Sequence, residues 1–308
     1  MKRIRPASTS KALIYTACIC VFSFCASLHT EAQTVTGIPY PEPLPGLTPI
    51  TFLPGSVSTD SIEFNSAFSP DRKSFYFTRK INGQSKIHVS WYDGKNWTKP
   101  VPASFSDNPY SNADPAFAAG GKLYFISNRP KNGSDTPSDY DIWFCKPLSG
   151  GRWSEPENLQ IVNTDSNEYY ISFSKNGNLY FASDRKGGFG EEDIYVSRLI
   201  NGKYTTPANL GAAINSAKSE YDPCISPNED FIIFTSSNRE GGFGGADLYY
   251  AKSQGGRDWT PAVNLGKNFN TPGREYCSYL SPDGKYFFFS SSGDIKWVSI
   301  RAIDALVR

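Results

Sequence analysis

The feature that most constrains the fold of this chain is a repeat of about 50 residues that occurs five times after residue 60. In the clearest copy, residues 168–211, four short apolar runs are separated by turns such as Asn176-Gly177, which predicts a four-stranded antiparallel sheet. Successive copies begin 49 to 56 residues apart, at Glu63, Asn112, Glu168, Glu220 and Glu275. One such sheet cannot bury both faces, so we expect each copy to pack between two others.

Two further features recur in every copy. A turn follows the first apolar run, as at residues 281–284, Ser-Pro-Asp-Gly. The second run of each copy carries a phenylalanine: Phe77, Phe125, Phe181, Phe234 and Phe289. This agreement predicts an all-β protein, a five-bladed β-propeller of four-stranded antiparallel blades. A tryptophan recurs shortly before a proline in three copies, which predicts packing between blades: Trp97, Trp153 and Trp259.

The third apolar runs begin with similar tripeptides, Asp141-Ile142-Trp143 and Asp193-Ile194-Tyr195 among them. With the Ser-Pro-Asp turns, these residues resemble the TolB-type β-propeller repeat, a WD-like repeat, over roughly residues 55–303. The resemblance implies a propeller and, by analogy with that family, a partner in the cell envelope. It indicates the fold more firmly than the function, because propellers include binding modules and several classes of enzyme.

The last copy ends after residues 298–303 and lacks an outer strand, whereas residues 50–53 resemble the ends of the complete copies. We therefore expect an N-terminal strand to close the last blade, since a closed ring leaves no open sheet edge. The predicted propeller domain spans residues 50–308. Residues 33–49 are rich in proline and predict an extended, poorly packed leader.

Residues 1–32 have the composition of a secretory signal peptide, with a basic start, an apolar stretch and Thr30-Glu31-Ala32 before the expected cleavage site. A membrane anchor is the alternative, and lipidation at Cys25 is disfavoured by Phe24 before it. Removal of this segment would leave no membrane span. We therefore expect a periplasmic or secreted protein, and a monomer.

The formal charge of +1, without a basic stripe, gives no reason to expect nucleic acid binding. Three cysteines remain after the signal. Cys224 and Cys277 could form a disulfide, although two buried thiols are the preferred interpretation, and Cys145 is the third. No zinc spacing or hydrolase triad motif occurs, and His88 is the one histidine beyond the signal.

The residues that open the copies would lie at one end of the innermost strands. As a ring they could bind a cation, an amine or sugar hydroxyls; the predicted ligand-binding set is Glu63, Asn112, Glu168, Glu220, Glu275, with Tyr169, Tyr221 and Tyr276 beside them. The structural alternative is that each glutamate pairs with an arginine at the end of the second strand or accepts backbone N–H groups of the next blade, because buried carboxylates are normally paired or hydrogen-bonded. The arginines in question are Arg79, Arg129, Arg185 and Arg239.

Asp114 and Asp222 stand two positions after the opening residue and would face the same way along a regular strand. With Glu220 they could form a catalytic carboxylate set, an arrangement that resembles the arabinanase-type five-bladed glycosidases. Each aspartate also precedes a proline at one repeat position, as a structural residue would. We favour a non-catalytic binding or scaffold propeller of the cell envelope over this carbohydrate-active alternative.

Gly-Gly-Phe-Gly loops at Gly187 and Gly241 have acidic neighbours. Calcium binding there is possible in principle, but a hairpin reversal explains the glycines more simply, and we expect no metal or other cofactor. The expected partner is a cell-envelope protein or a glycan, recognised through one face of the ring.

Overall fold

The computed structural model describes residues 37–131, 138–255 and 258–307. The predicted signal peptide, residues 1–32, lies outside the described residues. No helix in the described ranges is long and apolar enough to cross a membrane.

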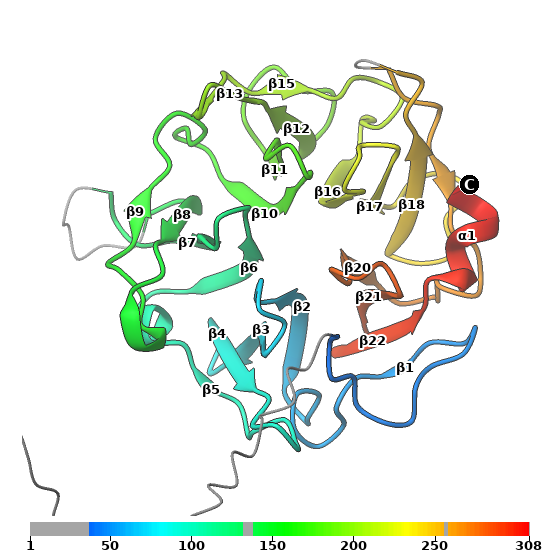
Figure 1. Cartoon of the computed structure of the whole chain (residues 1–308). Helices are drawn as coiled ribbons and strands as arrows, with labels where there is room; N and C mark the ends of the chain where they lie inside the picture. The colour runs from blue at the N-terminus through cyan, green and yellow to red at the C-terminus, as the bar shows by residue number, and fades with distance from the viewer. Residues whose placement is uncertain (1–36, 132–137, 256–257, 308) are drawn as a thin grey trace, which may run out of the picture. The chain divides into compact units, whose positions relative to one another are not determined.

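The strands of the described residues form five four-stranded antiparallel sheets, arranged as a ring (Figure 1). Blade 1 contains β2 (Ile62–Phe68), β3 (Ser74–Ile81), β4 (Gln84–Trp91) and β5 (Val101–Pro102). Blade 2 contains β6 (Asn112–Phe117), β7 (Leu123–Ser127), β8 (Asp141–Cys145) and β9 (Glu157–Asn158). Blade 3 contains β10 (Glu168–Phe173), β11 (Leu179–Ser183), β12 (Asp193–Ser197) and β15 (Ala208–Asn209).

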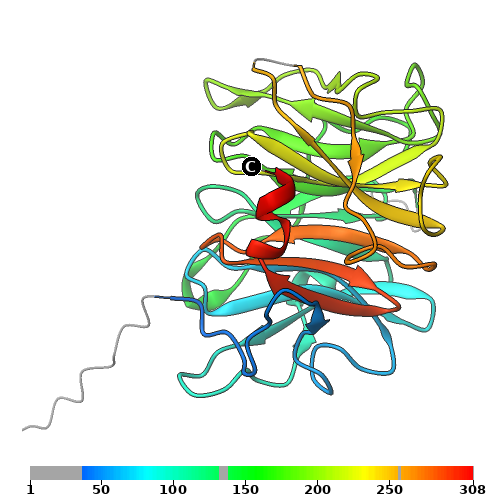
Figure 2. The same ribbon diagram turned by 90° about the vertical axis from the view of Figure 1, so that its right-hand side faces the viewer.

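Blade 4 contains β16 (Ser219–Ile225), β17 (Phe231–Ser237), β18 (Ala246–Lys252) and β19 (Val263–Asn264). Blade 5 contains β20 (Glu275–Leu280), β21 (Tyr286–Ser291), β22 (Asp294–Ser299) and β1 (Ile50–Thr51). A small hairpin, β13 (Leu199–Ile200) and β14 (Lys203–Tyr204), projects from blade 3. The helix α1 (Arg301–Val307) follows β22 and is seen face-on in Figure 2.

The predicted closure of the last blade is confirmed. β1 pairs antiparallel with β22, with Ile50 opposite Trp297 and Thr51 opposite Lys296. The N–H of Phe52 continues this contact by donating to the carbonyl of Ile295 at 2.9 Å. The five-bladed all-β prediction is therefore correct, including the strand supplied from the N-terminal side.

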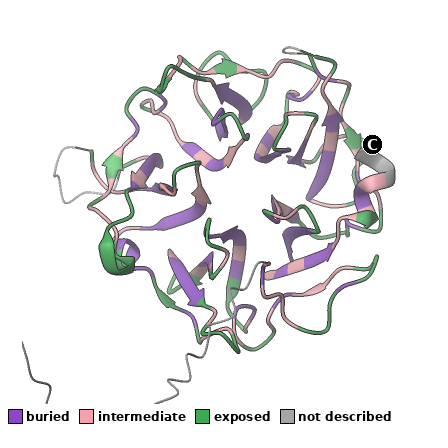
Figure 3. Ribbon diagram, viewed as in Figure 1, coloured by how far each residue is buried: buried purple, intermediate pink, exposed green. Residues whose placement is uncertain are grey.

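Burial follows the sheets, as Figure 3 shows. The five phenylalanines of the second strands are at most 2% exposed, and each belongs to a buried cluster that two neighbouring blades share. The three recurrent tryptophans pack between blades as expected. Trp97 contacts the buried hydrophobic residues that blades 1 and 5 share, and Trp259 belongs to those that blades 3 and 4 share. Trp153 contacts Tyr76 of blade 1. The three cysteines of the described region are free and buried, so Cys224 and Cys277 form no disulfide.

The proline-rich segment packs more closely than its composition predicts. The ring of Tyr40 contacts Phe68, Tyr286 and Trp297, and its hydroxyl donates to Asp283 Oδ1 at 2.8 Å. The indole N–H of Trp97 donates to the carbonyl of Pro39. Aromatic contacts therefore attach residues 38–40 to blades 1 and 5, which proline content alone could not indicate.

Candidate functional site

The first strand of each blade lines the axis of the ring and has a β-bulge at one repeat position (Figure 1). The residue at each bulge has a positive φ between 41° and 63°: Asn65, Asp114, Tyr170, Asp222 and Cys277. We call these five residues the axial ring. Left-handed backbone is unfavourable for residues other than glycine, and least so for Asn and Asp. Its occurrence in five blades shows that the bulge belongs to this propeller's architecture.

The axial ring joins neighbouring blades. Asp222 Oδ2 accepts the backbone N–H of Cys277 in the next blade at 2.8 Å, and the Asp114 carboxyl accepts the N–H of Tyr170 in the next blade. The N–H of Asp114 in turn donates to Thr78 Oγ1 of blade 1 at 3.2 Å. The Tyr170 hydroxyl crosses the axis to the carbonyl of Ser278. Each of these aspartates therefore accepts a hydrogen bond from the backbone of the next blade, which is a structural role.

A cavity of about 450 Å³ lies where the first strands begin, and we call it the acidic cavity. Its walls include the two aspartates of the axial ring, two acidic residues that precede β12, aromatic residues of four first strands, and one arginine: Asp114, Asp222, Glu191, Glu192, Phe64, Tyr169, Tyr221, Tyr276 and Arg274. The structure thus brings together both predicted aspartates and all three predicted tyrosines. Each of these tyrosines is half-buried.

The bulge explains how adjacent residues share one cavity. In a regular strand Tyr221 and Asp222 would point to opposite faces of the sheet. The left-handed conformation of Asp222 turns the chain, so that both line the cavity. The expectation that Asp222 and Glu220 face the same way, which rested on regular alternation, is wrong for this reason.

Burial and the charge of Asp222 shift the pKa values of carboxyl groups in the acidic cavity. Burial and the charge of Asp222 raise the pKa of Asp114 well above its ordinary value. Burial raises the pKa of Asp222 to about 6, although the hydrogen bonds from Cys277 oppose this shift. Burial, followed by the charge of Asp222, raises the pKa of Glu192 to about 7. The cavity therefore changes its charge between mildly acidic and neutral pH.

Arg274 is the basic residue of the acidic cavity. It is exposed, donates to the Tyr221 hydroxyl at 3.1 Å, and partly offsets the acidic groups by lowering the pKa values of Asp222 and Glu192. Asp114 Oδ1 is buried and has no hydrogen-bond partner among the described residues. One carboxyl oxygen is thus left for another partner.

The opening residues of the copies are placed elsewhere. Glu63, Asn112, Glu168, Glu220 and Glu275 are fully buried at the ends of the blades and are not among the residues that line the acidic cavity. Glu63 pairs with Arg79 at 2.6 Å, Glu168 with Arg185 at 2.9 Å, and Glu220 with Arg239 at 3.8 Å. Asn112 accepts from Arg129, and Glu275 from Ser291. The opening residues of blades 1 to 4 therefore pair with arginine, as in the structural alternative, whereas Glu275 of blade 5 accepts from a serine hydroxyl.

The Gly-Gly-Phe-Gly loops are organised by the aspartate that begins the third strand. Asp193 accepts the N–H groups of Phe189 and Gly190, and Asp247 accepts the N–H of Phe243. No group of three metal-ligating side chains is found in the described ranges. The carboxylates beside these loops thus cap backbone N–H groups.

No protein-family model matches the chain, and no curated protein matches its sequence. Among solved structures, a complex of BT0996 and RGII superposes with a TM-score of 0.53 at 12% identity, over 83% of this protein and 91% of that one. A hydrazine synthase from Kuenenia stuttgartiensis gives 0.51 at 16% identity, over 78% of this protein and 37% of that one. An endo-arabinanase from Bacillus licheniformis gives 0.49 at 15% identity, over 79% and 94%. At these identities the likeness is one of fold.

Sequence reasoning missed several members of the acidic cavity, among them Glu192, Arg274 and Phe64. Glu192 and Arg274 belong to loops between strands, and their approach to the axis depends on how neighbouring blades meet. Phe64 carried a usable signal, because the residue after the opening position is aromatic in four of the five copies: Phe64, Tyr169, Tyr221 and Tyr276.

Proposed function

We propose that this protein is a non-catalytic binding propeller that takes a carbohydrate into the acidic cavity. The observation that best supports this function is the meeting of carboxylates and tyrosines in one recess of about 450 Å³. Carboxylates accept hydrogen bonds from hydroxyl groups, and tyrosine offers an apolar ring with a polar end. A recess with a few polar groups suits a small hydroxylated ligand better than a flat protein surface.

The absence of catalysis is part of this proposal. Asp222 is 6% exposed and already accepts the N–H of Cys277, and Asp114 accepts the N–H of Tyr170. A carboxyl held by backbone groups has less freedom to attack a substrate or deliver a proton.

The setting we propose is the cell envelope. The signal-peptide composition of residues 1–32 and the resemblance to the TolB-type repeat support this setting.

Thermal shift and calorimetry test the binding function. The intact chain is titrated with peptidoglycan fragments, soluble envelope polysaccharides, oligosaccharides and calcium. A sugar at a hundred times its Kd should stabilise the fold by about 2.7 kcal/mol. We expect this shift to be lost in Tyr221→Ala and Asp114→Asn, and kept in Asp60→Asn, which changes an exposed carboxylate outside the cavity. A sugar that binds Tyr221→Ala and wild type equally contradicts the proposal, and no shift with any sugar favours a protein partner.

Glycoside hydrolysis is the second candidate, and the pKa values of about 6 for Asp222 and about 7 for Glu192 favour it. Carboxyl groups that titrate near neutrality can donate or accept a proton there. Chromatography of a bound oligosaccharide decides between the candidates. Release of shorter products by wild type but not by Glu192→Gln would establish hydrolysis, whereas a ligand that stays intact agrees with binding alone.

A further inference from the structure

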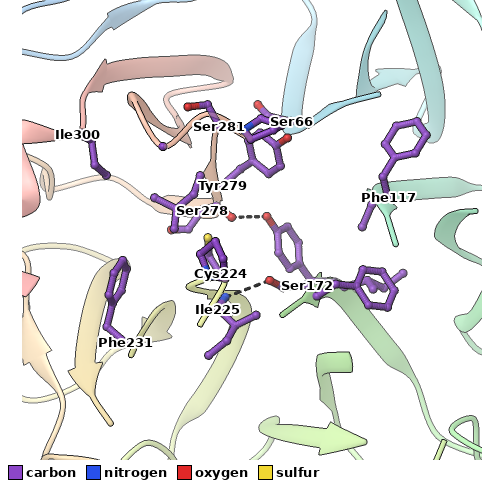
Figure 4. A pocket seen from close by; sticks show the side chains of 18 of the residues that line it. Ser66, Phe117, Ser172, Cys224, Ile225, Phe231, Ser278, Tyr279, Ser281 and Ile300 are labelled. Carbon is purple, nitrogen blue, oxygen red and sulfur yellow. Dashed lines mark hydrogen bonds between the residues drawn. The ribbon is translucent and has the colours of Figure 1, made fainter. Parts of the chain in front are cut away.

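A second cavity, of about 350 Å³, lies where the first strands end, which is the opposite end of the axis from the acidic cavity. We call it the apolar cavity (Figure 4). All five inner strands contribute to it, and it extends past the turn at residues 281–284 to Ile300 and Asp304. The axial ring stands between the two cavities: Tyr170 lines the apolar cavity, and Asp222 lines the acidic one.

The walls of the apolar cavity are mainly hydrocarbon. Four aromatic side chains contribute half-buried surfaces, Phe117, Phe173, Phe231 and Tyr279, and they are joined by aliphatic residues and prolines. Among the lining residues the one ionisable carboxylate is Asp304, which lies in α1, and there is no lysine or arginine. Its composition is thus the reverse of that of the acidic cavity, and it favours an uncharged ligand.

A few hydroxyl groups converge on this hydrocarbon surface. Ser278 Oγ is buried and has no hydrogen-bond partner in the part of the chain that the structure describes. Ser172 Oγ accepts the N–H of Ile225 at 3.0 Å, and the Tyr279 hydroxyl accepts the N–H of Phe68 at 3.0 Å, so each is engaged as an acceptor and can still donate. Buried hydroxyls in an apolar wall bind best to a ligand with an acceptor oxygen, since an unmade hydrogen bond there is unfavourable.

We propose that the apolar cavity is a second binding site, for a small, uncharged, mainly apolar molecule that carries one acceptor oxygen. The aromatic side chains lie in a concave wall formed by five inner strands, where a folded protein could not contact them. An anionic ligand is disfavoured because no basic residue lines the cavity. The site goes beyond the proposed carbohydrate function, because the axial ring separates the two cavities and no residue lines both of them.

Fluorescence titration with the neutral ketone Prodan tests this site in the intact chain. We expect saturable binding of one probe per chain, with a blue-shifted emission. Ala116 lines the cavity, so Ala116→Phe should fill part of it and weaken binding at least tenfold. Ala119→Phe is the matched control, because Ala119 is exposed in the turn three residues later, and it should bind as wild type does.

Ser278→Ala provides a second variant that removes an unpartnered hydroxyl and leaves the packing in place. It should fold with unchanged or higher stability and bind Prodan several-fold more weakly. Asp222→Asn should bind the probe as wild type does, which keeps this result separate from the carbohydrate test. Absence of saturable binding, or equal binding by wild type, Ala116→Phe and Ser278→Ala, would overturn the proposal.

Discussion

At one end of each blade, a single buried side chain makes hydrogen bonds with several neighbouring groups. In blade 1, Glu63 accepts the N–H and the hydroxyl of Thr59, four residues earlier, and the guanidinium of Arg79. In blades 3, 4 and 5 the opening glutamate likewise accepts the N–H and the hydroxyl of a Thr or Ser four residues earlier. Blade 2 replaces it with an amide pair, in which Asn112 Nδ2 donates to Asn108 Oδ1 at 3.1 Å. The buried carboxylates are thus structural groups with nearly complete hydrogen bonding.

The amide pair of blade 2 predicts energetic coupling. Asn112→Glu alone should destabilise the fold, because it places carboxylate oxygens against the acceptor of Asn108 and the carbonyl of Tyr110. Asn108→Thr in the same chain should restore part of that loss by supplying a donor, as Thr59 does. We expect a coupling free energy of about 1 kcal/mol from a double-mutant cycle measured by denaturant unfolding. Additive single effects would contradict this interpretation.

Asp222 predicts a pH dependence of stability. Its pKa of about 6 lies above the ordinary value of 3.8, so the folded state binds a proton more tightly than the unfolded state. This group's contribution to the free energy of unfolding should therefore fall as the pH rises from about 4 to about 6, and stay low above that. Asp222→Asn should be more stable than wild type at pH 8, by about 1–3 kcal/mol, and lose this advantage near pH 4. Urea unfolding at both pH values measures the difference, with Asp60→Asn as control.

At the scale of elements, steric fit explains the Gly-Gly-Phe-Gly loops of blades 3 and 4. A side chain at Gly190 would collide with the carbonyls of Ser216 and Lys218, and one at Gly188 with the carboxyl of Asp193. Phe189, in contrast, is 53% exposed. The fold therefore requires the glycines of this loop, while it leaves the phenylalanine at the surface.

Substitutions in this loop should separate the two roles. Gly190→Ala should destabilise the protein by about 1–3 kcal/mol, because the adjacent backbone must move to admit a methyl group. Phe189→Ala should change stability by no more than about 0.5 kcal/mol, as expected for an exposed residue. Guanidinium unfolding of both variants tests this expectation, and a Phe189→Ala cost as large as that of Gly190→Ala would show a packing role instead.

At the scale of the whole molecule, blade 5 holds the ring closed with strands from both ends of the propeller. Phe52 follows β1, is fully buried, and contacts Phe75 of blade 1 with Phe288 and Trp297 of blade 5. Its ring thus joins the first blade, the last blade and the closing strand. Loss of this contact affects the whole ring rather than one blade.

Phe52→Ala should therefore lower the free energy of unfolding by about 3–5 kcal/mol, the usual cost of removing a buried aromatic ring. Leu47→Ala is the control, because Leu47 lies just before β1 and is 62% exposed. Calorimetry compares the two variants. If the ring were held by the other blades alone, Phe52→Ala would melt as Leu47→Ala does.

The repeat made the blades and the closing strand predictable, because hydrophobic pattern and turn residues are local and occur five times. The candidate site was harder to predict from the sequence. Asp114, Asp222 and the three tyrosines could be named from their repeat positions. They line one cavity because the first strands contain bulges with left-handed residues such as Tyr170, and no local sequence pattern predicts these bulges. Glu192 and Arg274 reach the axis through contacts between blades, which single-blade periodicity cannot reveal.

The pairing of Ile50 with Trp297 also bears on the order of folding. Hairpins within each blade join residues close in sequence, whereas this contact closes a loop that contains nearly the whole propeller. Loop closure costs free energy that grows only slowly with length, about 0.6 kcal/mol per doubling, so the long loop is tolerated at equilibrium. Contacts between distant residues nonetheless form slowly. The hydrogen bonds of β1 should thus be the last of the sheets to gain protection, after the blades that they lock together.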